Sequence, residues 1–234
     1  MDATLRRLAP LTGIGFVVLS VFAIIIGLSD SPDFAASERE IVDFYADNKD
    51  EILIATIAIT VSAPFYIWFL GCVRSAIARA EGGTTRLAST AFGAGVASLA
   101  LWLAGWLINA MGALRLDEND AIGAQTATAY WDIGQILAFA AVAAAAAGLL
   151  AATAIASLRY KAILPAWLAY ITIVIAIVDV IPFISFIGIF LGLLWILVVS
   201  VMLYVQRVGE GDAPAAAAPP PPAAPAPPPP GSTL

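Results

Sequence analysis

Residues 162–205 read AILPAWLAYITIVIAIVDVIPFISFIGIFLGLLWILVVSVMLYV, a run of 44 residues in which Asp179 is the only charged residue. About 20 apolar residues in a helix span the roughly 30 Å hydrocarbon core of a bilayer, so this run is too long for one span and suits two. Helices tend to end at or before the residue that precedes a proline, and Pro182 divides the run. We predict a tight hairpin of two spans, at 162–181 and 184–205; the alternative is one long broken or re-entrant segment.

The rest of the chain carries further apolar runs of spanning length, and the composition agrees with them. Hydrophobic residues make up 61% of the chain and charged residues 12%, against about 25% charged in soluble domains. We predict an all-α fold, a polytopic transmembrane helical bundle of six spans over residues 11–207. The first four spans are expected at 11–28, 52–73, 88–111 and 133–156. The first run is longer than a signal-peptide core and lacks a clear cleavage site, so we expect an uncleaved anchor.

The distribution of basic residues predicts the orientation of the bundle. Cytoplasmic loops are enriched in Lys and Arg. With the N-terminus (1–10) inside, eight of the 11 basic residues fall on the cytoplasmic side. These eight are Arg6, Arg7, Arg74, Arg79, Arg86, Arg159, Lys161 and Arg207. We therefore predict an N-in, C-in protein of the plasma membrane.

Two segments outside the spans have distinct compositions. Residues 30–51 are acidic, and Ser37 with Glu40 fits a capping box that begins an amphipathic helix. We interpret 30–51 as an acidic outer helical loop. Residues 208–234 are dominated by Ala and Pro, which is typical of a disordered cytoplasmic tail of polyproline II character.

The absence of histidine excludes several kinds of chemistry. The chain offers no imidazole for metal or haem binding and no Ser-His or Cys-His pair. It also lacks a P-loop motif. We therefore expect a non-enzymatic protein without cofactor or metal, and the net charge of −6 argues against nucleic acid as a partner.

A few polar residues within or beside the spans are the candidate functional positions. Ionisable residues in a membrane are costly and mark functional sites by default. Asp179 is predicted near the outer end of the fifth span, as a proton or cation site or as a carboxylate that reaches outer water. Asp132, Gln135 and Asn109 are predicted at the same outer level. Together these four residues either line an outer vestibule or are ordinary interfacial polar residues.

Proline and glycine positions suggest how the helices bend and pack. Pro64 lies inside the second span, where it removes a helix hydrogen bond and predicts a kink, either a gating hinge or a packing bend. Small residues let helices approach closely in lipid. Gly188 and Gly192 form such a pair in the sixth span, and Gly93 and Gly95 in the third.

Two sequence segments carry a resemblance to known proteins. One is Ser37-x-x-Glu40-Ile41-Val42-x-Phe44-Tyr45 with the later Trp68-Phe69-Leu70-Gly71, and the other is Tyr130-Trp131-Asp132-Ile133-Gly134. They resemble segments of uncharacterised bacterial multi-pass membrane proteins of unknown function. The resemblance implies a six-span bundle in a bacterial plasma membrane and carries no known activity.

Two functions are compatible with these observations. The first is a non-enzymatic accessory or scaffold subunit that binds a membrane-protein partner in the lipid bilayer through its acidic outer helix or its tail. The second is a small channel or transporter for a cation, a proton or a small solute, which would use Asp179, Asp132, Gln135 and Asn109.

Overall fold

The computed structural model describes residues 8–33, 35–119, 122–181 and 184–212, and these are helical apart from short connections. Pro182 and residues 213–234 of the predicted tail lie outside the described residues. The helices are η1 (Ala9–Leu11), α2 (Thr12–Gly27), α3 (Glu38–Asp47), α4 (Lys49–Glu81), α5 (Arg86–Asn119), α6 (Ala124–Gln135), η2 (Ile136–Ala141), α7 (Val142–Tyr160), α8 (Ala166–Asp179) and α9 (Ser185–Asp212).

Five of the helical stretches are long and apolar enough to cross a membrane. They are Ala9–Gly27, Lys49–Glu81, Arg86–Leu116, Ala124–Tyr160 and Phe186–Gln206. The apolar helix α8 is shorter, with 14 residues. The described residues therefore form an all-helical protein with five candidate spanning helices.

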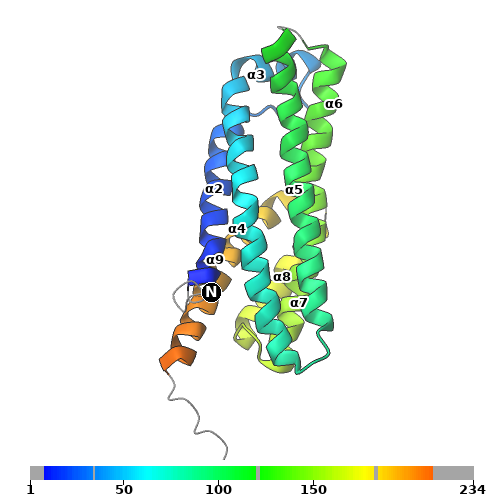
Figure 1. Cartoon of the computed structure of the whole chain (residues 1–234). Helices are drawn as coiled ribbons and strands as arrows, with labels where there is room; N and C mark the ends of the chain where they lie inside the picture. The colour runs from blue at the N-terminus through cyan, green and yellow to red at the C-terminus, as the bar shows by residue number, and fades with distance from the viewer. Residues whose placement is uncertain (1–7, 34, 120–121, 182–183, 213–234) are drawn as a thin grey trace, which may run out of the picture.

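The long helices pack side by side into an elongated bundle (Figure 1). Helix α4 packs against α2 and α5, and α5 packs against the continuous helix formed by α6, η2 and α7. Helix α8 packs on α7, and α9 packs on both α8 and α2. Figure 1 shows α8 and α9 beside the lower part of the bundle, while α3 lies across its upper end.

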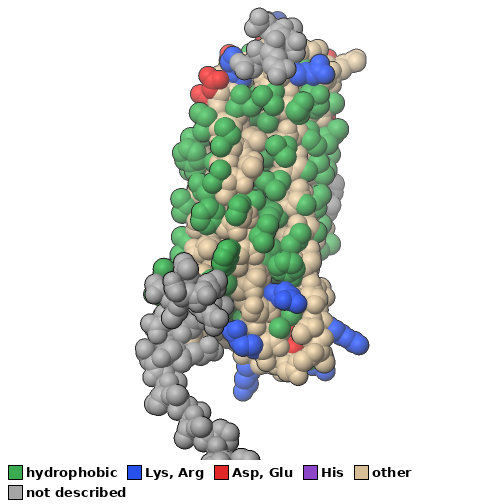
Figure 2. Space-filling model, in the orientation of Figure 1, with side chains coloured by type: hydrophobic (Ala, Val, Ile, Leu, Met, Phe, Trp, Pro, Cys, Tyr) green, Lys and Arg blue, Asp and Glu red, His purple; other side chains and the backbone are tan. Residues whose placement is uncertain are grey.

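The sides of the bundle are apolar and its two ends are charged. Large hydrophobic side chains such as Ile57, Val174 and Ile177 are more than half exposed. Figure 2 shows hydrophobic side chains over the length of the bundle, with basic side chains towards its lower end. Soluble monomers rarely expose apolar surface of this extent. The outer surface therefore suits contact with lipid.

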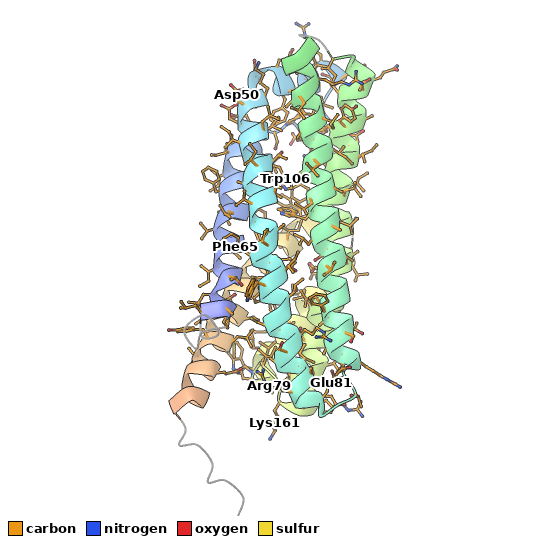
Figure 3. The ribbon with its side chains drawn as sticks, viewed as in Figure 1. Asp50, Phe65, Arg79, Glu81, Trp106 and Lys161 are labelled. Atoms are coloured by element: carbon orange, nitrogen blue, oxygen red, sulfur yellow. The ribbon has the colours of Figure 1, made fainter. Side chains whose placement is uncertain are left out.

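Charged side chains of both signs lie at both ends of the bundle, and the acidic helix α3 makes one end richer in carboxylates. Figure 3 places Asp50 at the upper end, and Arg79, Glu81 and Lys161 at the lower end. The acidic helix α3 also belongs to the upper end. We call these the acidic end and the basic end.

Helix α3 begins with the capping box that the sequence predicts. The Glu40 backbone N–H donates to the Ser37 hydroxyl at 3.4 Å, and the Ser37 backbone N–H donates to Glu40 Oε2 at 2.7 Å. The Ser37 hydroxyl also donates to Glu40 Oε2, at 3.0 Å, and the two hydrogen bonds that Ser37 donates to this carboxylate lower the pKa of Glu40. The apolar face of α3 buries Ile41, Phe44 and Tyr45 against the bundle. The helix is thus fixed at its start and along one side.

The turn between α4 and α5 at the basic end is held by Glu81. Glu81 Oε1 accepts from the Leu87 N–H and Oε2 from the Ala88 N–H, both at 2.9 Å. These are N–H groups of the first turn of α5, which have no partner within the helix. Gly82 adopts φ 65°, the left-handed conformation that a helix C-terminus favours.

Replacing Glu81 by Ala is expected to destabilise the protein by about 2 kcal/mol, because the buried Ala88 N–H and the partly buried Leu87 N–H lose their acceptor. Arg79→Ala is the matched control, since Arg79 is exposed in the same turn and should change stability by less than about 0.5 kcal/mol. Unfolding in mixed detergent micelles, followed by circular dichroism, measures both. Equal stability of the two variants would contradict the capping role.

Candidate functional site

A cavity in the middle of the bundle has Asp179 among its lining residues. The cavity has a volume of about 60 Å³ and takes lining residues from α2, α4, α5, α7, α8 and α9. Its polar lining residues are Asp179, Tyr66 and Ser98, and Trp102 adds an indole. Most of the other lining side chains are aliphatic. We call this space the Asp179 cavity.

Asp179 is placed in the cavity by the end of α8 and by a glycine of α9. Asp179 is the last residue of α8 and is only 2% exposed. A Cβ atom at Gly188 would overlap Asp179 Oδ1 and would lie 3.1 Å from its Cγ. The absence of a side chain at Gly188 therefore makes the room that the carboxyl group occupies.

The carboxyl group lacks a direct partner within the described chain. Asp179 Oδ1 is buried without a hydrogen bond. Among the residues that the structure describes, the ion pair found is Arg39 with Asp43, at the acidic end. An isolated charge in an apolar interior costs several kcal/mol unless an opposite charge or a proton accompanies it. A charged carboxylate at this position would therefore need a proton or a cation beside it.

Two hydroxyl groups and an indole supply the other polar atoms near this carboxyl group. The Ser98 hydroxyl donates to the Gly95 carbonyl at 2.8 Å, so it is free to accept from the Tyr66 hydroxyl, which lies 3.4 Å away. The buried Trp102 Nε1 has no hydrogen-bond partner. A cavity of this size has room for a few water molecules, and these groups are the partners that such water needs.

The Asp179 cavity lies near the middle of the long helices rather than near their outer ends. Tyr66 is close to the midpoint of α4 (Lys49–Glu81), and Ser98 and Trp102 are close to the midpoint of α5 (Arg86–Asn119). The prediction that Asp179 lies close to the outer boundary depends on the assumption that the fifth span crosses the whole membrane. The shortness of α8 is the reason for the difference.

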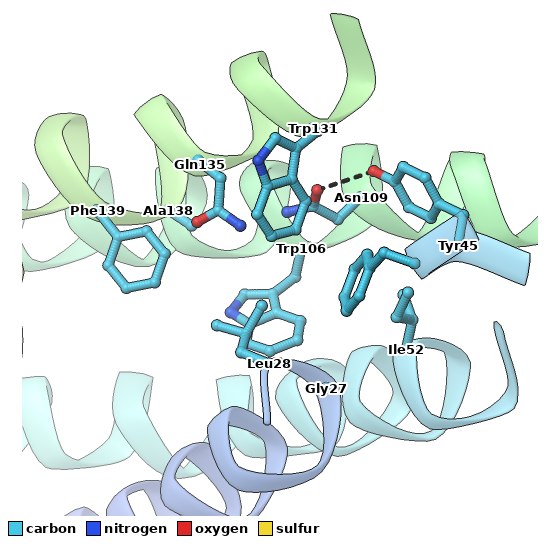
Figure 4. A pocket seen from close by; sticks show the side chains of 11 residues that line it. Gly27, Leu28, Tyr45, Ile52, Trp106, Asn109, Trp131, Gln135, Ala138 and Phe139 are labelled. Carbon is cyan, nitrogen blue, oxygen red and sulfur yellow. Dashed lines mark hydrogen bonds between the residues drawn. The ribbon is translucent and has the colours of Figure 1, made fainter. Parts of the chain in front are cut away.

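A second, smaller chamber lies under α3 at the acidic end (Figure 4). Its volume is about 10 Å³, and it is lined by Asn109, Gln135, Tyr45 and two tryptophans, Trp106 and Trp131, among others. The Tyr45 hydroxyl donates to Asn109 Oδ1 at 3.1 Å (Figure 4). Burial, with a smaller contribution from the charge of Asp132, raises the pKa of Tyr45 and keeps its hydroxyl protonated.

The four residues predicted for an outer vestibule do not meet at one place. Asn109 and Gln135 both line the chamber under α3. Asp132 is exposed on α6, and Asp179 lies in a cavity that shares no lining residue with the chamber. The Trp102 ring separates the two spaces, with Phe139 at 6.5 Å and Trp106 at 5.9 Å between ring centroids.

Pro64 lies within α4, which is continuous from Lys49 to Glu81. The hydroxyls of Thr56, Thr60 and Ser62, which lie near Pro64 in the sequence, donate to the carbonyls of Ile52, Thr56 and Ile59 and not to the Thr60 carbonyl that Pro64 leaves without a donor.

The four predicted packing glycines differ in their surroundings. Gly95 is packed tightly on Leu70 of α4, and Gly188 is packed on Asp179. A Cβ at Gly93 or at Gly192 would meet nothing within 4 Å. Gly192 instead contributes to the lining of the Asp179 cavity.

Sequence reasoning missed Tyr66, Ser98 and Trp102 as neighbours of Asp179. Each is an isolated polar or amphipathic residue in an apolar span, and its spacing from Asp179 along the chain carries no signal. Within the described residues no group of three or more His, Cys, Asp or Glu side chains is placed to hold a metal ion.

No protein-family model, curated protein or solved structure matches this chain. The resemblance to bacterial multi-pass membrane proteins therefore stays a prediction, and function has to be argued from the site itself.

Proposed function

We propose that this chain is a non-enzymatic integral protein of the bacterial plasma membrane that transfers protons through its helical bundle, with Asp179 as the proton-carrying group. The observation that carries the proposal is the buried Asp179 carboxyl group, whose Oδ1 has no partner and which faces a cavity with other polar groups. Carboxyl groups that bind and release protons inside a membrane are the usual components of proton relays.

A proton suits this site better than a metal cation does. Hard cations such as Ca²⁺ and Mg²⁺ require about six or more oxygen ligands. The lining residues of the Asp179 cavity offer one carboxylate and the hydroxyls of Tyr66 and Ser98. A proton requires a single oxygen atom and a chain of hydrogen-bonding groups or water, which these residues supply.

The orientation that we propose places the basic end of the bundle in the cytoplasm. Arg79, Arg86, Arg159 and Lys161 belong to the helix ends and turns at that end. Cytoplasmic enrichment in Lys and Arg supports this orientation. In Figure 1 the start of α2 and the end of α9 lie towards this end of the bundle. Their position supports cytoplasmic N- and C-termini.

Transfer across the whole bundle also requires a route from the Asp179 cavity to the acidic end. The chamber under α3 contains the amides of Asn109 and Gln135 and is the next polar space along the bundle. The aromatic layer of Trp102, Trp106 and Phe139 separates the two spaces. We propose that side-chain movement in this layer connects them during transfer.

The proposal is tested by reconstituting the purified protein into lipid vesicles that contain a pH-sensitive dye. A potassium gradient with valinomycin sets an inside-negative potential. We expect proton uptake well above that of protein-free vesicles. Uptake equal to that of protein-free vesicles, from protein that remains folded by circular dichroism, would overturn the proposal.

An accessory role is the second candidate function, and the geometry of α3 favours it. The helix is fixed to the bundle by Ile41, Phe44 and Tyr45, so its acidic face is presented as a rigid surface. That face includes the exposed Glu40, Asp43 and Asp47. A membrane-protein partner with a basic outer surface would fit it. Crosslinking in the native membrane should then recover a stoichiometric partner that is lost when these three carboxylates are replaced by lysine.

A further inference from the structure

We infer that α8 and the first part of α9 form a re-entrant helical hairpin, which enters the membrane from the basic end and turns back near mid-depth with Asp179 at its tip. The chain would then cross the membrane four times, through α2, α4, α5 and the continuous helix of α6, η2 and α7. This inference concerns the position of the hairpin and stands whether or not the protein moves protons.

The length of α8 is the first observation. Its 14 residues extend about 21 Å at 1.5 Å per residue. The hydrocarbon core is about 30 Å thick, so α8 is too short to cross it. The four crossing segments are longer: α4 has 33 residues, and the shortest, η1 with α2 (Ala9–Gly27), has 19, close to the roughly 20 that a span needs. Helix α9, with 28 residues, is long enough to span, so its position is argued from the level at which it begins.

The second observation is the level at which α8 ends and α9 begins. Asp179, at the end of α8, shares its cavity with Tyr66 and Ser98 from the middle of α4 and α5. The Phe186 ring, in the first turn of α9, lies 5.5 Å from the Phe139 ring of η2, measured between centroids. The described residues on both sides of the reversal are therefore beside the middle of the bundle.

The third observation is that both open ends of the hairpin lie at the basic end. Just before α8, the Leu164 N–H donates to the Ser157 hydroxyl near the end of α7, at 3.1 Å. Towards the end of α9, the Gln206 side chain donates to the Ile163 carbonyl at 2.9 Å. Helix α9 thus returns to the loop from which α8 started, as Figure 1 shows.

The half of the bundle towards the acidic end is filled without α8 or α9. The buried cluster there consists of Ile41, Phe44, Tyr45, Ile52, Ala113, Ala127 and Trp131. The chamber beside it takes its lining residues from α2, α3, α4, α5, α6 and η2 and their flanking residues. No described residue after Phe139 belongs to either set. Among the described residues, α9 reaches this chamber through the contact of Phe186 with Phe139, and α8 contributes nothing to either set.

The chain around the reversal is suited to a membrane interior. Backbone groups there must be satisfied internally. The N–H groups of Val180, Ile181 and Ile184 donate to carbonyls three residues earlier at 3.0–3.3 Å. The side chains of Val180 and Ile181 are 60% and 44% exposed, which suits lipid better than water.

The hairpin position is tested by cysteine labelling in intact cells, in a Cys72→Ala background that removes the only cysteine of the chain. Ile181→Cys and Ile184→Cys variants are treated with a membrane-impermeant maleimide. Asp43→Cys, on the exposed face of α3, is the control for the outer side, and Lys161→Cys, in the loop before α8, is the control for the inner side. We expect labelling of the Asp43 variant alone. Labelling of the Ile181 or Ile184 variant to the level of the Asp43 variant would overturn the inference and restore six spans.

A depth measurement covers the case in which these positions are unreactive for another reason. A spin label at Ile184→Cys in vesicles is compared for its collisions with oxygen, which concentrates in the bilayer centre, and with a water-soluble nickel complex. We expect the oxygen-rich, nickel-poor pattern of the bilayer centre. A pattern typical of the headgroup region would overturn the inference. Neither cysteine labelling nor the depth measurement uses proton flux. A failure of the proposed proton transfer can therefore be distinguished from a failure of the hairpin inference.

Discussion

Replacing Asp179 by Asn is expected to reduce proton uptake into reconstituted vesicles to the level of protein-free vesicles. Asn has nearly the same shape as a protonated Asp, so it fills the space that Gly188 leaves for the carboxyl group. It cannot bind and release a proton at neutral pH. The variant therefore removes the proton-carrying group while it preserves the packing of α8 on α9.

The matched control is Asp43→Asn, which removes a carboxylate from the exposed face of α3, far from the Asp179 cavity. We expect this variant to retain the uptake of the unmodified protein. Uptake that survives Asp179→Asn would exclude Asp179 as the carrier. Loss of uptake in Asp132→Asn instead would transfer the role to the exposed carboxylate on α6.

Replacing Gly105 by Ala is expected to destabilise the bundle by about 2 kcal/mol, because overpacking a close helix contact typically costs about 1–3 kcal/mol. A Cβ at Gly105 would lie 2.6 Å from the Ala138 backbone nitrogen and 2.8 Å from the Gly134 carbonyl oxygen. Backbone atoms cannot turn aside as a flexible side chain does. Helix α5 would have to move away from α6 and η2.

The matched control is Gly93→Ala in the same helix, where a Cβ would meet nothing within 4 Å. Ala is favoured over Gly in a helix by about 1 kcal/mol, so this variant should be equally stable or more stable. Unfolding in mixed micelles, followed by circular dichroism, gives both values. If the two variants unfold at the same detergent composition, the close contact at Gly105 does not contribute as described.

Gly105 also connects stability to the candidate site. Its close contact is with Ala138 of η2, a π-helical segment that also contains Phe139. Phe139 belongs to the aromatic layer between the chamber under α3 and the Asp179 cavity. π-Helical segments are rare and occur often at functional sites. The close packing of α5 on this segment holds the backbone of η2, so the movement proposed for the layer is confined to its side chains.

The sequence by itself predicted an all-helical chain with several apolar helices of spanning length, and the structure confirms this coarse description with five candidate spanning helices. Long apolar runs have few stable solutions other than helices in lipid, because every backbone group must find a partner within the run. Local rules were sufficient elsewhere as well: the pair Ser37 and Glu40 forms the predicted capping box, because that interaction involves residues three apart on one helix. The sequence also drew attention to Asp179, since a single charge in a long apolar run is conspicuous.

Only the tertiary structure decided what surrounds Asp179. Its neighbours Tyr66, Ser98 and Gly188 come from three other helices, and hydropathy along the chain does not record which helices touch or at what level. The same limitation applies to the run 162–205, because its composition is compatible both with two spans and with a hairpin that turns back. The cavity that Asp179 shares with mid-helix residues and the hydrogen bond from Gln206 to the loop before α8 are the observations that favour the hairpin. The depth at which a residue such as Asp179 lies in a bundle is set by packing between segments that are far apart in the sequence. For that reason the fold decides this depth and the local sequence does not.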